Sequence, residues 1–458
     1  MMPHAAQKDM APGSLPDSPG SSGCDLLLTA RRLVTQDEAR GVLENAAVAV
    51  KDGVIAAVGP RAEVEAAWKA ATAVDLGQSC ILPGLINTHG HAAMTIFRGL
   101  EDDLPLMDWL TKHIFPVERQ LTREVVYLGS LLAAAEMIRT GTTCFTDMYL
   151  FEEDTARAVD ASGLRAVLGD GIFAVPQCAY THPDEVWPIL EKFAASWKGH
   201  PRIRPGYMAH SVYLTPPDML SRAYETACRE GALFSLHLAE TRIETQNCLR
   251  QYGRRPTAHL ESLGLLSPRS LLVHCVDVDD ADTAMIAAAG AHVAHCPKSN
   301  LKLASGVAPV TAMLAAGINV ALGTDGAASN NSLDLFSEMG FAALLHKGVT
   351  RDPLAVPAQA ALDMATRNAA RALAWPELGT LAPGRPADLI ALDMTDPGMQ
   401  PVYNPVSQAV YAASGARVCL SMVGGKILYR DGRFETIDQP SLLREIEEIT
   451  AWVRARLV

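Results

Sequence analysis

The strongest constraint on the fold is an alternation of short apolar runs with helix-like segments between residues 83 and 379. The apolar runs that read as buried strands are ILPGLINTH, TCFTDM, RAVLGDGI, IRPGYMAHS, ALFSLHLAE, SLLVHCVDV, AHVAHCPKS and INVALGTDG. Helical spacing of apolar residues marks the segments between them, among them EVVYLGSLLAAAEMIRTG, PDMLSRAYETACREG and DDADTAMIAAAG. This alternation predicts an α/β fold of the (β/α)8 TIM-barrel type. A doubly wound open sheet is the alternative, but no G-x-G-x-x-G follows the first strand and no P-loop sequence occurs.

Both flanks of this region have a β-rich pattern. Hairpin signals stand at Asp52-Gly53, Gly424-Gly425 and Asp431-Gly432, each between two apolar runs. We therefore expect a small β-sandwich domain built from both chain ends, from residues 23–82 and 380–437, beside a barrel of residues 83–379.

The two termini are predicted to differ from each other. Residues 1–22 are rich in Pro, Gly and Ser and lack the apolar core of a signal peptide, so they are expected to form a disordered tail. Residues 438–458 carry apolar side chains at helical spacing, which predicts a C-terminal helix with Ser441 as its N-cap.

The composition limits the classes of partner. The net charge is −12, and no basic stripe is present to neutralise phosphates, so a nucleic-acid partner is not expected. No run of 18 apolar residues occurs, so no membrane span is expected. The nine cysteines are scattered and never spaced C-x-x-C, which favours a reducing, cytoplasmic location over a disulfide framework. A homo-oligomer is the expected state.

Polar side chains directly follow several of the apolar runs. His89 and His91 follow the first run, and because they are two residues apart on extended backbone, both imidazoles point to the same face. Four other runs end in His210, His237 with Glu240, His274 and Asp325. Each of these alone is more commonly a histidine or acid hydrogen-bonded to a loop. Active sites of barrels lie at the C-terminal strand ends, however, and a buried ring of such groups is costly unless it is paired or metal-bound.

His89, His91, His237 and Asp325 form a candidate metal set of three imidazoles and one carboxylate. Nitrogen and oxygen donors without thiolate favour one Zn²⁺ ion, with Fe²⁺ or Mn²⁺ as alternatives. A catalytic metal keeps one position for water and lowers the pKa of that water toward 7. Asp325 is expected both to bind the metal and to accept a proton from the water.

Two further side chains are predicted to move protons. Glu240 lies three residues beyond His237, within reach of the group that is attacked, and burial would raise its pKa enough for it to act as an acid. His274 would lie beside the water and orient it or share its proton.

The motifs HGHAAMTIFRG, HLAET, VHC, CPKSNLKLASG and GTDGAASNNSLDLF resemble the amidohydrolase superfamily, and most closely its 5′-methylthioadenosine/S-adenosylhomocysteine deaminase branch. The resemblance implies a (β/α)8 barrel with a flanking β-sandwich, and one zinc held by the four ligands named above. It implies hydrolytic deamination of a purine, in which hydroxide attacks the carbon bearing the amino group, Glu240 protonates the ring nitrogen and His274 assists. Two-metal members carry a carboxylated lysine at the fourth strand, which IRPGYMAHS lacks.

The resemblance also implies how a nucleoside is held. The glutamate that matches Glu118 binds the ribose hydroxyls, for which a carboxylate is a good acceptor, and the histidine that matches His210 contacts the nucleoside. Trp109 and Phe115 are candidates for an apolar wall against a base or thioether, with core packing as the alternative for both.

The chain departs from the family pattern after the third strand. Relatives that accept S-adenosylhomocysteine place arginines there to pair with its carboxylate, whereas AVPQCAYTHPDEVW has none and Asp170, Asp184 and Glu185 add negative charge. We therefore expect 5′-methylthioadenosine and adenosine to be preferred over S-adenosylhomocysteine.

Two other functions remain open from the sequence. A deaminase or hydrolase of a free base or triazine (guanine, 8-oxoguanine, cytosine or a halotriazine) would use the same metal set, but Glu118 with His210 favours a nucleoside because a free base has no diol. A non-enzymatic scaffold is the other alternative, which the presence of every ligand and acid–base candidate disfavours.

Overall fold

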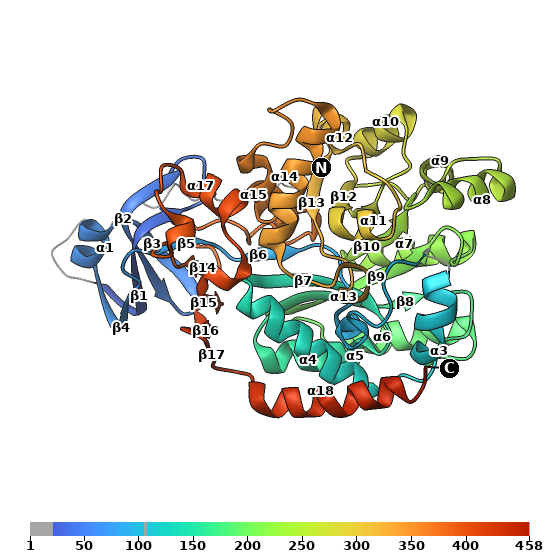
Figure 1. The fold of residues 1–458 in the computed structure, drawn as a ribbon, viewed down its shortest axis with the longest axis horizontal. Coiled ribbons are helices and arrows are strands. Elements are labelled where there is room, and N and C mark those ends of the chain that lie inside the picture. Colours follow the sequence, from blue (N-terminus) through green and yellow to red (C-terminus); the bar gives the residue numbers. More distant parts are fainter. Residues whose placement is uncertain (1–21, 105–107, 458) are drawn as a thin grey trace, which may run out of the picture.

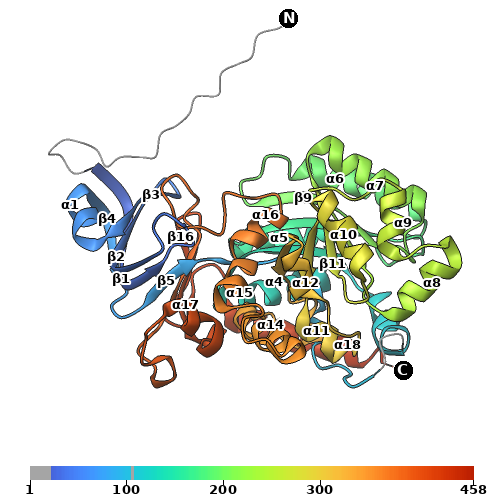
Figure 2. The same ribbon diagram turned by 90° about the horizontal axis from the view of Figure 1, so that it is seen from above.

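The computed structural model describes residues 22–104 and 108–457. Residues 1–21 of the predicted disordered tail lie outside the described residues, and residue 22 begins a strand. The described part forms an eight-stranded parallel barrel with a separate sheet beside it (Figure 1), so the predicted fold class is confirmed. Strands β1–β5 and β14–β17 form the separate sheet, at one end of the molecule in both views (Figure 2).

All eight predicted barrel strands are present, in chain order around the barrel. They are β6 (Leu85–Asn87), β7 (Thr142–Tyr149), β8 (Arg165–Ile172), β9 (Ile203–Ser211), β10 (Leu233–Leu238), β11 (Ser270–His274), β12 (His292–His295) and β13 (Asn319–Leu322). The residue that follows the first strand meets the end of the last strand: the Thr88 amide and hydroxyl both donate to the carbonyl of Leu322 in β13, at 3.0 and 2.8 Å. Because all eight strands are parallel, their C-terminal ends lie together at one end of the barrel.

Helices surround the barrel between these strands. The principal ones are α4 (Arg123–Arg139), α5 (Glu152–Ser162), α6 (Val186–Ser196), α7 (Pro217–Glu230), α8 (Arg242–Tyr252), α9 (Pro256–Ser262), α10 (Asp280–Ala289), α11 (Pro297–Lys302), α12 (Val310–Ala315), α13 (Ala327–Asn330), α14 (Leu335–Thr350), α15 (Ala358–Met364) and α16 (Arg367–Ala372). Between β6 and α4 lie η1 (Ala92–Phe97), the π-helix η2 (Trp109–Ile114) and α3 (Phe115–Glu118). Across residues 22–104 and 108–457, none of the helices has the length and apolar character needed to cross a membrane.

The separate sheet takes strands from both ends of the chain. They are β1 (Ser22–Val34), β2 (Val42–Lys51), β3 (Val54–Pro60), β4 (Trp68–Asp75), β5 (Cys80–Pro83), β14 (Leu389–Leu392), β15 (Val418–Val423), β16 (Lys426–Arg430) and β17 (Arg433–Phe434). Hydrogen bonds link all nine into one continuous sheet, in which β5 pairs with both β1 and β14. The three predicted hairpin turns are confirmed, and each has two residues in the left-handed region, as a tight two-residue turn requires.

Three local features differ from the sequence-based expectation. The run ILPGLINTH is not one strand, because Pro83 and Gly84 divide it between β5 in the sheet and β6 in the barrel. A Cβ atom added to Gly84 would lie 2.1 Å from the Thr143 hydroxyl oxygen and collide with it. The link between the sheet and the barrel therefore requires glycine at this position. A helix, α1 (Arg61–Ala67), lies within the predicted β-rich flank.

The N-cap predicted at Ser441 is wrong. The C-terminal helix α18 (Gln439–Arg454) is capped by Asp438, whose side chain accepts a hydrogen bond from the Ser441 backbone N–H. Pro440 occupies the first turn, where its missing N–H costs nothing. Leu442, Ile449 and Val453 of α18 are buried in the core that also contains α4, and Figure 1 shows α18 running along that helix.

A buried ion pair joins the barrel to the sheet, and its removal gives a stability prediction. Arg165 of β8 makes two hydrogen bonds to Asp388, at 2.6 and 3.0 Å, and both side chains are buried. We expect Asp388→Ala to lower the free energy of unfolding by about 3–5 kcal/mol, because it leaves the Arg165 charge buried and unpaired. Denaturant unfolding measures this change. Glu65→Ala, which removes an exposed partner of Arg61, should lower the free energy of unfolding far less, and equal losses would contradict the prediction.

Candidate metal-dependent active site

Four side chains from three strand ends converge at the C-terminal end of the barrel. His89 and His91 follow β6, His237 belongs to β10 and Asp325 follows β13. The Nε2 atoms of His89 and His237 are 3.2 Å apart, and Asp325 Oδ1 lies 3.4 Å from His89 Nε2 and 3.2 Å from His91 Nε2. Ligand atoms about 2.0–2.2 Å from one zinc ion lie no more than roughly 4.4 Å from one another, and four such ligands leave a fifth position for water. The donor set and its spacing therefore fit one zinc ion.

Hydrogen bonds on the far side of two of the candidate ligands, His91 and His237, fix the orientation of their rings. His91 Nδ1 donates to the Met148 carbonyl at 2.6 Å, and His237 Nδ1 donates to the His210 carbonyl at 2.7 Å. Each Nε2 therefore keeps its lone pair for the site. Burial lowers the pKa of His89 to about 4 and also lowers that of His237, which favours neutral rings at these two positions. Burial also acts to lower the pKa of His91, but the adjacent Asp325 carboxylate raises it to about 9, so a metal ion must displace a proton to bind this ring.

Asp325 is held as firmly as the imidazoles. Its Oδ2 accepts hydrogen bonds from the hydroxyls of Ser299, at 2.6 Å, and Ser329, at 2.9 Å. The Gly326 amide donates to its Oδ1 at 2.8 Å. Its backbone lies in the left-handed region, with φ of 62°, an uncommon conformation for a residue other than glycine. The strained backbone of Asp325 and the three hydrogen bonds that its carboxylate accepts indicate a functional role for this side chain.

Glu240 and His274 lie beside these four residues. His274 Nε2 is 3.8 Å from Glu240 Oε2, and the His274 ring stacks on that of His237, with centroids 5.5 Å apart. Burial raises the pKa of Glu240, so the protonated form that can donate to a substrate persists to higher pH than in water. The Glu244 carboxylate accepts from the amides of Ala239 and Glu240, at 3.0 and 2.9 Å, and so fixes the turn that carries Glu240.

A small cavity of about 110 Å³ opens beside these groups. Its walls are mainly apolar and aromatic, as in most small-molecule sites. Its lining comprises His91, Met94, Trp109, Leu110, Ile114, Phe115, Glu118, Met148, Tyr149, Phe173, His210, Tyr213, His237, Glu240, His274, Leu303, Asp325 and Ser329. Thus every candidate site residue named from the sequence, except the fully enclosed His89, lines this one cavity.

Glu118 is the carboxylate farther from the ligand set. Its Oε1 accepts a hydrogen bond from the Tyr149 hydroxyl at 2.5 Å, and burial raises its pKa, against which the Tyr149 bond acts. His210 contacts the rings of Phe173 and Tyr213, with centroids 4.8 and 5.9 Å away, and burial lowers its pKa to about 3, so it is neutral.

Sequence reasoning missed Tyr149, Phe173 and Tyr213 in this cavity. Tyr149 is the last residue of β7, so the strand-end argument would have found it had it been applied to the second strand. Asp170, Asp184 and Glu185, expected from the sequence to add negative charge near the substrate, do not line this cavity. Asp170 is buried and accepts from the Glu152 amide, and Asp184 is exposed in the short η3 helix (Pro183–Glu185), so neither lines the cavity.

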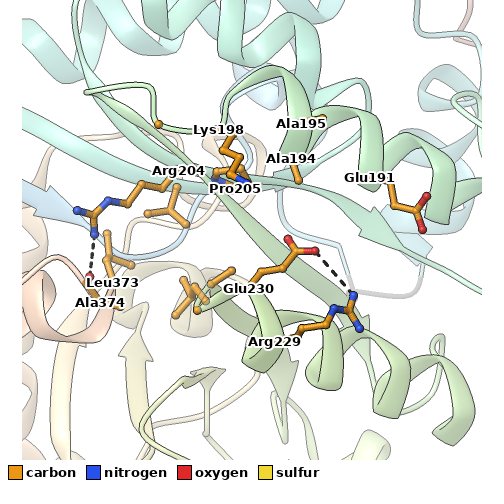
Figure 3. A pocket seen from close by; sticks show the side chains of 15 residues that line it. Glu191, Ala194, Ala195, Lys198, Arg204, Pro205, Arg229, Glu230, Leu373 and Ala374 are labelled. Atoms are coloured by element: carbon orange, nitrogen blue, oxygen red, sulfur yellow. Dashed lines mark hydrogen bonds and ion pairs between the residues drawn. The ribbon is translucent and has the colours of Figure 1, made fainter. Parts of the chain in front are cut away.

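A larger cavity, of about 740 Å³, lies where β9 and β10 begin, which is the opposite end of the barrel. Figure 3 shows the side chains that line it. Three of its charged side chains have partners: Arg229 pairs with Glu230 at 3.8 Å, and Arg204 donates to the Ala374 carbonyl at 2.8 Å and stacks over Trp375. Its lining includes no histidine or cysteine. Among the described residues, the candidate catalytic histidines and acids therefore line the smaller cavity and not this one.

Comparison with known proteins places the chain among metal-dependent hydrolases. The model of the amidohydrolase family matches residues 80–428, and a model for the bacterial imidazolonepropionase-like composite domain matches residues 46–68. A 5-methylthioadenosine/S-adenosylhomocysteine deaminase of Nitratidesulfovibrio vulgaris (strain DSM 19637 / Miyazaki F) is 51% identical over 434 residues, which cover 95% of this chain and 99% of that protein.

Two further proteins are similar along nearly their whole length. A 5′-deoxyadenosine deaminase of Methanosarcina mazei is 42% identical over 435 residues, which cover 94% of this chain and 99% of that protein. The crystal structure of an adenosine deaminase from Xanthomonas campestris with bound zinc superposes with a TM-score of 0.93 at 36% identity and covers 95% of this chain and all of that one.

Proposed function

The chain belongs to the amidohydrolase family, and we propose that it is a zinc-dependent deaminase that converts an adenosine-type nucleoside to its inosine analogue and ammonia. One observation carries the proposal: His89, His91, His237 and Asp325 converge at zinc-ligand spacing, with Glu240 beside them. The names of the similar deaminases, and the zinc of the Xanthomonas protein, support it.

The proposed mechanism assigns a task to each side chain. Bound by His89, His91, His237 and Asp325, zinc would acidify water and stabilise the oxyanion that develops. Asp325 and His274 face the attacking water and take its proton.

Glu240 supplies the second proton of the reaction. Its protonated carboxyl donates to the purine ring nitrogen next to the carbon that is attacked. The amino group then leaves as ammonia with the proton that Asp325 or His274 took from water, and the hydroxyl proton of the adduct returns to Glu240 as the carbonyl forms. The apolar walls of the cavity exclude bulk water from these transfers.

We propose that Glu118 holds the ribose, with His210 against the nucleoside and Trp109 in the apolar wall. Tyr149 occupies one oxygen of the Glu118 carboxylate, so the remaining acceptor positions face the cavity, where a 2′,3′-diol can donate to them. A free base or a triazine has no such diol, and this favours a nucleoside over the two alternatives on the same scaffold.

Glu118→Gln is therefore expected to raise KM for adenosine-type nucleosides about 10- to 100-fold while changing kcat less, because a hydrogen bond to a charged group contributes about 1.5–3 kcal/mol. Steady-state kinetics measure both constants. The exposed Glu101→Gln, on the same loop region, should leave both unchanged. The wild-type enzyme should bind 2′,3′-dideoxyadenosine about as weakly as the Glu118 variant binds adenosine, and equal KM values for adenosine in wild type and variant would rule out this role.

The lining also supports a preference at the 5′ position. Among the described residues that line the cavity there is no arginine or lysine, and Met94, Leu110, Phe115 and Leu303 are apolar. A 5′-methylthio or hydroxymethyl group fits such a wall, whereas the amino-acid carboxylate of S-adenosylhomocysteine would lack a cationic partner there.

A spectrophotometric screen tests the proposed function. Adenosine, 5′-methylthioadenosine, S-adenosylhomocysteine, adenine, guanine and cytosine are each followed for the absorbance change of amine loss, with EDTA-treated protein as the control. We expect turnover of the first two, slower turnover of the third and none of the free bases. Turnover of adenine or guanine alone would favour the free-base alternative, and comparable rates on the first three would contradict the 5′ preference.

We also propose that the chain is a cytoplasmic homo-oligomer. Nine free thiols, most of them buried, support a reducing location. Large apolar side chains of α14 and the loops near it are exposed, with Leu344 at 61%, Leu354 at 79% and Tyr403 at 93%, and such groups are common at subunit contacts. Light scattering of the purified protein should give at least twice the mass of one chain, and the mass of a single chain would contradict the proposal.

A further inference from the structure

His274 has a hydrogen-bond partner on the side that faces away from the cavity. Its Nδ1 lies 2.8 Å from Oδ1 of Asn300, and each residue is only 1% exposed. A carboxamide oxygen accepts hydrogen bonds and cannot donate, so the proton of a neutral His274 ring must be on Nδ1. The other ring nitrogen, Nε2, then carries a lone pair.

That lone pair points toward the reacting groups. Nε2 of His274 is 3.8 Å from Glu240 Oε2, and the ring is stacked on His237 and edge-on to His89, with a centroid distance of 5.7 Å to the latter. A ring in this position accepts a proton from water beside the ligand set only as the Nδ1–H tautomer. The Nε2–H tautomer would present a donor there instead.

Asn300 is itself held rigidly. It lies in α11, where its amide donates to the Cys296 carbonyl at 3.0 Å and its carbonyl accepts from the Ser305 amide at 2.8 Å. Its side-chain Nδ2 is buried and has no hydrogen-bond partner among the described residues. An unpaired buried donor costs free energy, so the only stabilising hydrogen bond of the Asn300 side chain is the one through its oxygen.

The backbone at His274 is strained, and the hydrogen bond to Asn300 helps to hold it in place. His274 and Cys275 both lie in the left-handed region, with φ of 72° and 47°, which is unusual for two consecutive residues other than glycine. The adjacent residue on α11, Ser299, donates to Asp325 Oδ2. One turn of helix thus contacts both groups that face the attacking water.

We propose that Asn300 is a positioning residue for deamination: it fixes His274 as the Nδ1–H tautomer, so that Nε2 can accept the proton of the attacking water. This inference rests on the proposed function, because it gives His274 its task within that reaction. It requires only the acceptor oxygen of Asn300 and assigns no role to Nδ2.

Two substitutions separate the acceptor from the shape of the side chain. Asn300→Leu has a similar volume but no acceptor, and it should lower kcat for 5′-methylthioadenosine about 10- to 100-fold, with KM and zinc content unchanged. Asn300→Asp keeps an oxygen toward His274 and should retain most of the activity.

Asn319→Leu is the matched control. Asn319 Nδ2 also bonds a histidine, His292 Nδ1, at 3.1 Å, but where β12 and β13 begin, at the opposite end of the barrel. It should leave kcat unchanged.

The tautomer can be read without turnover. ¹H–¹⁵N spectra of the histidine rings in metal-free protein, with His274→Gln to assign the signals, should show the His274 proton on Nδ1 in the wild type and on both nitrogens in Asn300→Leu. A wild-type proton on Nε2 would mean that the Asn300 amide is rotated, and it would overturn the proposal even if Asn300→Leu does not fold. Unchanged kcat in a folded Asn300→Leu would also overturn it, whereas a wild-type enzyme that turns over no nucleoside would refute the proposed function instead.

Discussion

Asp325→Ala is expected to lower kcat/KM for 5′-methylthioadenosine on the order of 10⁴-fold or more, because it removes a metal ligand and an acceptor for the proton of water at the same time. Asp325 Oδ1 lies 3.4 and 3.2 Å from two histidine Nε2 atoms, at the spacing of ligands on one ion. Without this carboxylate, three neutral imidazoles would have to hold a divalent cation with no negative charge among the ligands. We therefore expect zinc to be lost as well, which elemental analysis of the purified variant measures.

A buried acid that lies away from the site is the control for this variant. Asp282 is 1% exposed, accepts a hydrogen bond from the backbone amide of Asp279, the N-cap of α10, and pairs with Arg255 at 2.6 Å. Asp282→Asn should lower stability while leaving zinc content and kcat near the wild-type values. If Asp325→Ala keeps one zinc per chain and more than a tenth of the activity, the assignment of Asp325 as a ligand is wrong.

Glu240→Gln should lower kcat on the order of 10²- to 10⁴-fold without loss of zinc, because glutamine cannot supply the proton that the ring nitrogen needs. The two variants thus differ in metal content: loss of zinc with Asp325→Ala, retention with Glu240→Gln. Full activity in Glu240→Gln, or loss of its zinc, would contradict the role of Glu240 as a proton donor.

The pH profile gives a second test of Glu240. Burial raises the pKa of its carboxyl, and only the protonated form donates, so the contribution of Glu240 is present below this pKa and is lost as pH rises through it. The wild-type kcat should therefore fall on the alkaline side. Glutamine does not titrate, so that decrease should be absent from the residual activity of Glu240→Gln.

Much of the fold follows from local sequence signals. Apolar runs of strand length gave all eight barrel strands, and the residue pairs Asp52-Gly53, Gly424-Gly425 and Asp431-Gly432 gave the hairpin turns, because such turns require left-handed backbone that glycine and aspartate tolerate. The N-cap of the last helix was wrong because Ser441 and Asp438 are both good caps, and only the path of the chain before Pro440 decides between them.

The site could be predicted to the extent that it follows strand ends. His89, His91, His237 and Asp325 stand directly after or within apolar runs, and parallel strands bring such positions together whatever their distance in the chain. Tyr149 and Asn300 were not predicted because their roles depend on which side chains they contact. Tyr149 of β7 donates a hydrogen bond to Glu118, and Asn300, 26 residues after His274 in the chain, accepts one from that histidine. The positions of Asp170 and Asp184 relative to the cavity likewise depend on how the loops fold.

Titration of the metal-free protein with zinc measures whether the four candidate ligands form a single catalytic metal site. Chelator-treated protein at known concentration receives increasing Zn²⁺, and deamination of 5′-methylthioadenosine is followed by absorbance at each step. We expect no activity at the start, a linear rise and a sharp plateau at one zinc per chain, because His89, His91, His237 and Asp325 are proposed to form one site. A plateau at two equivalents, activity that persists without metal, or no activity at any zinc concentration would contradict this proposal.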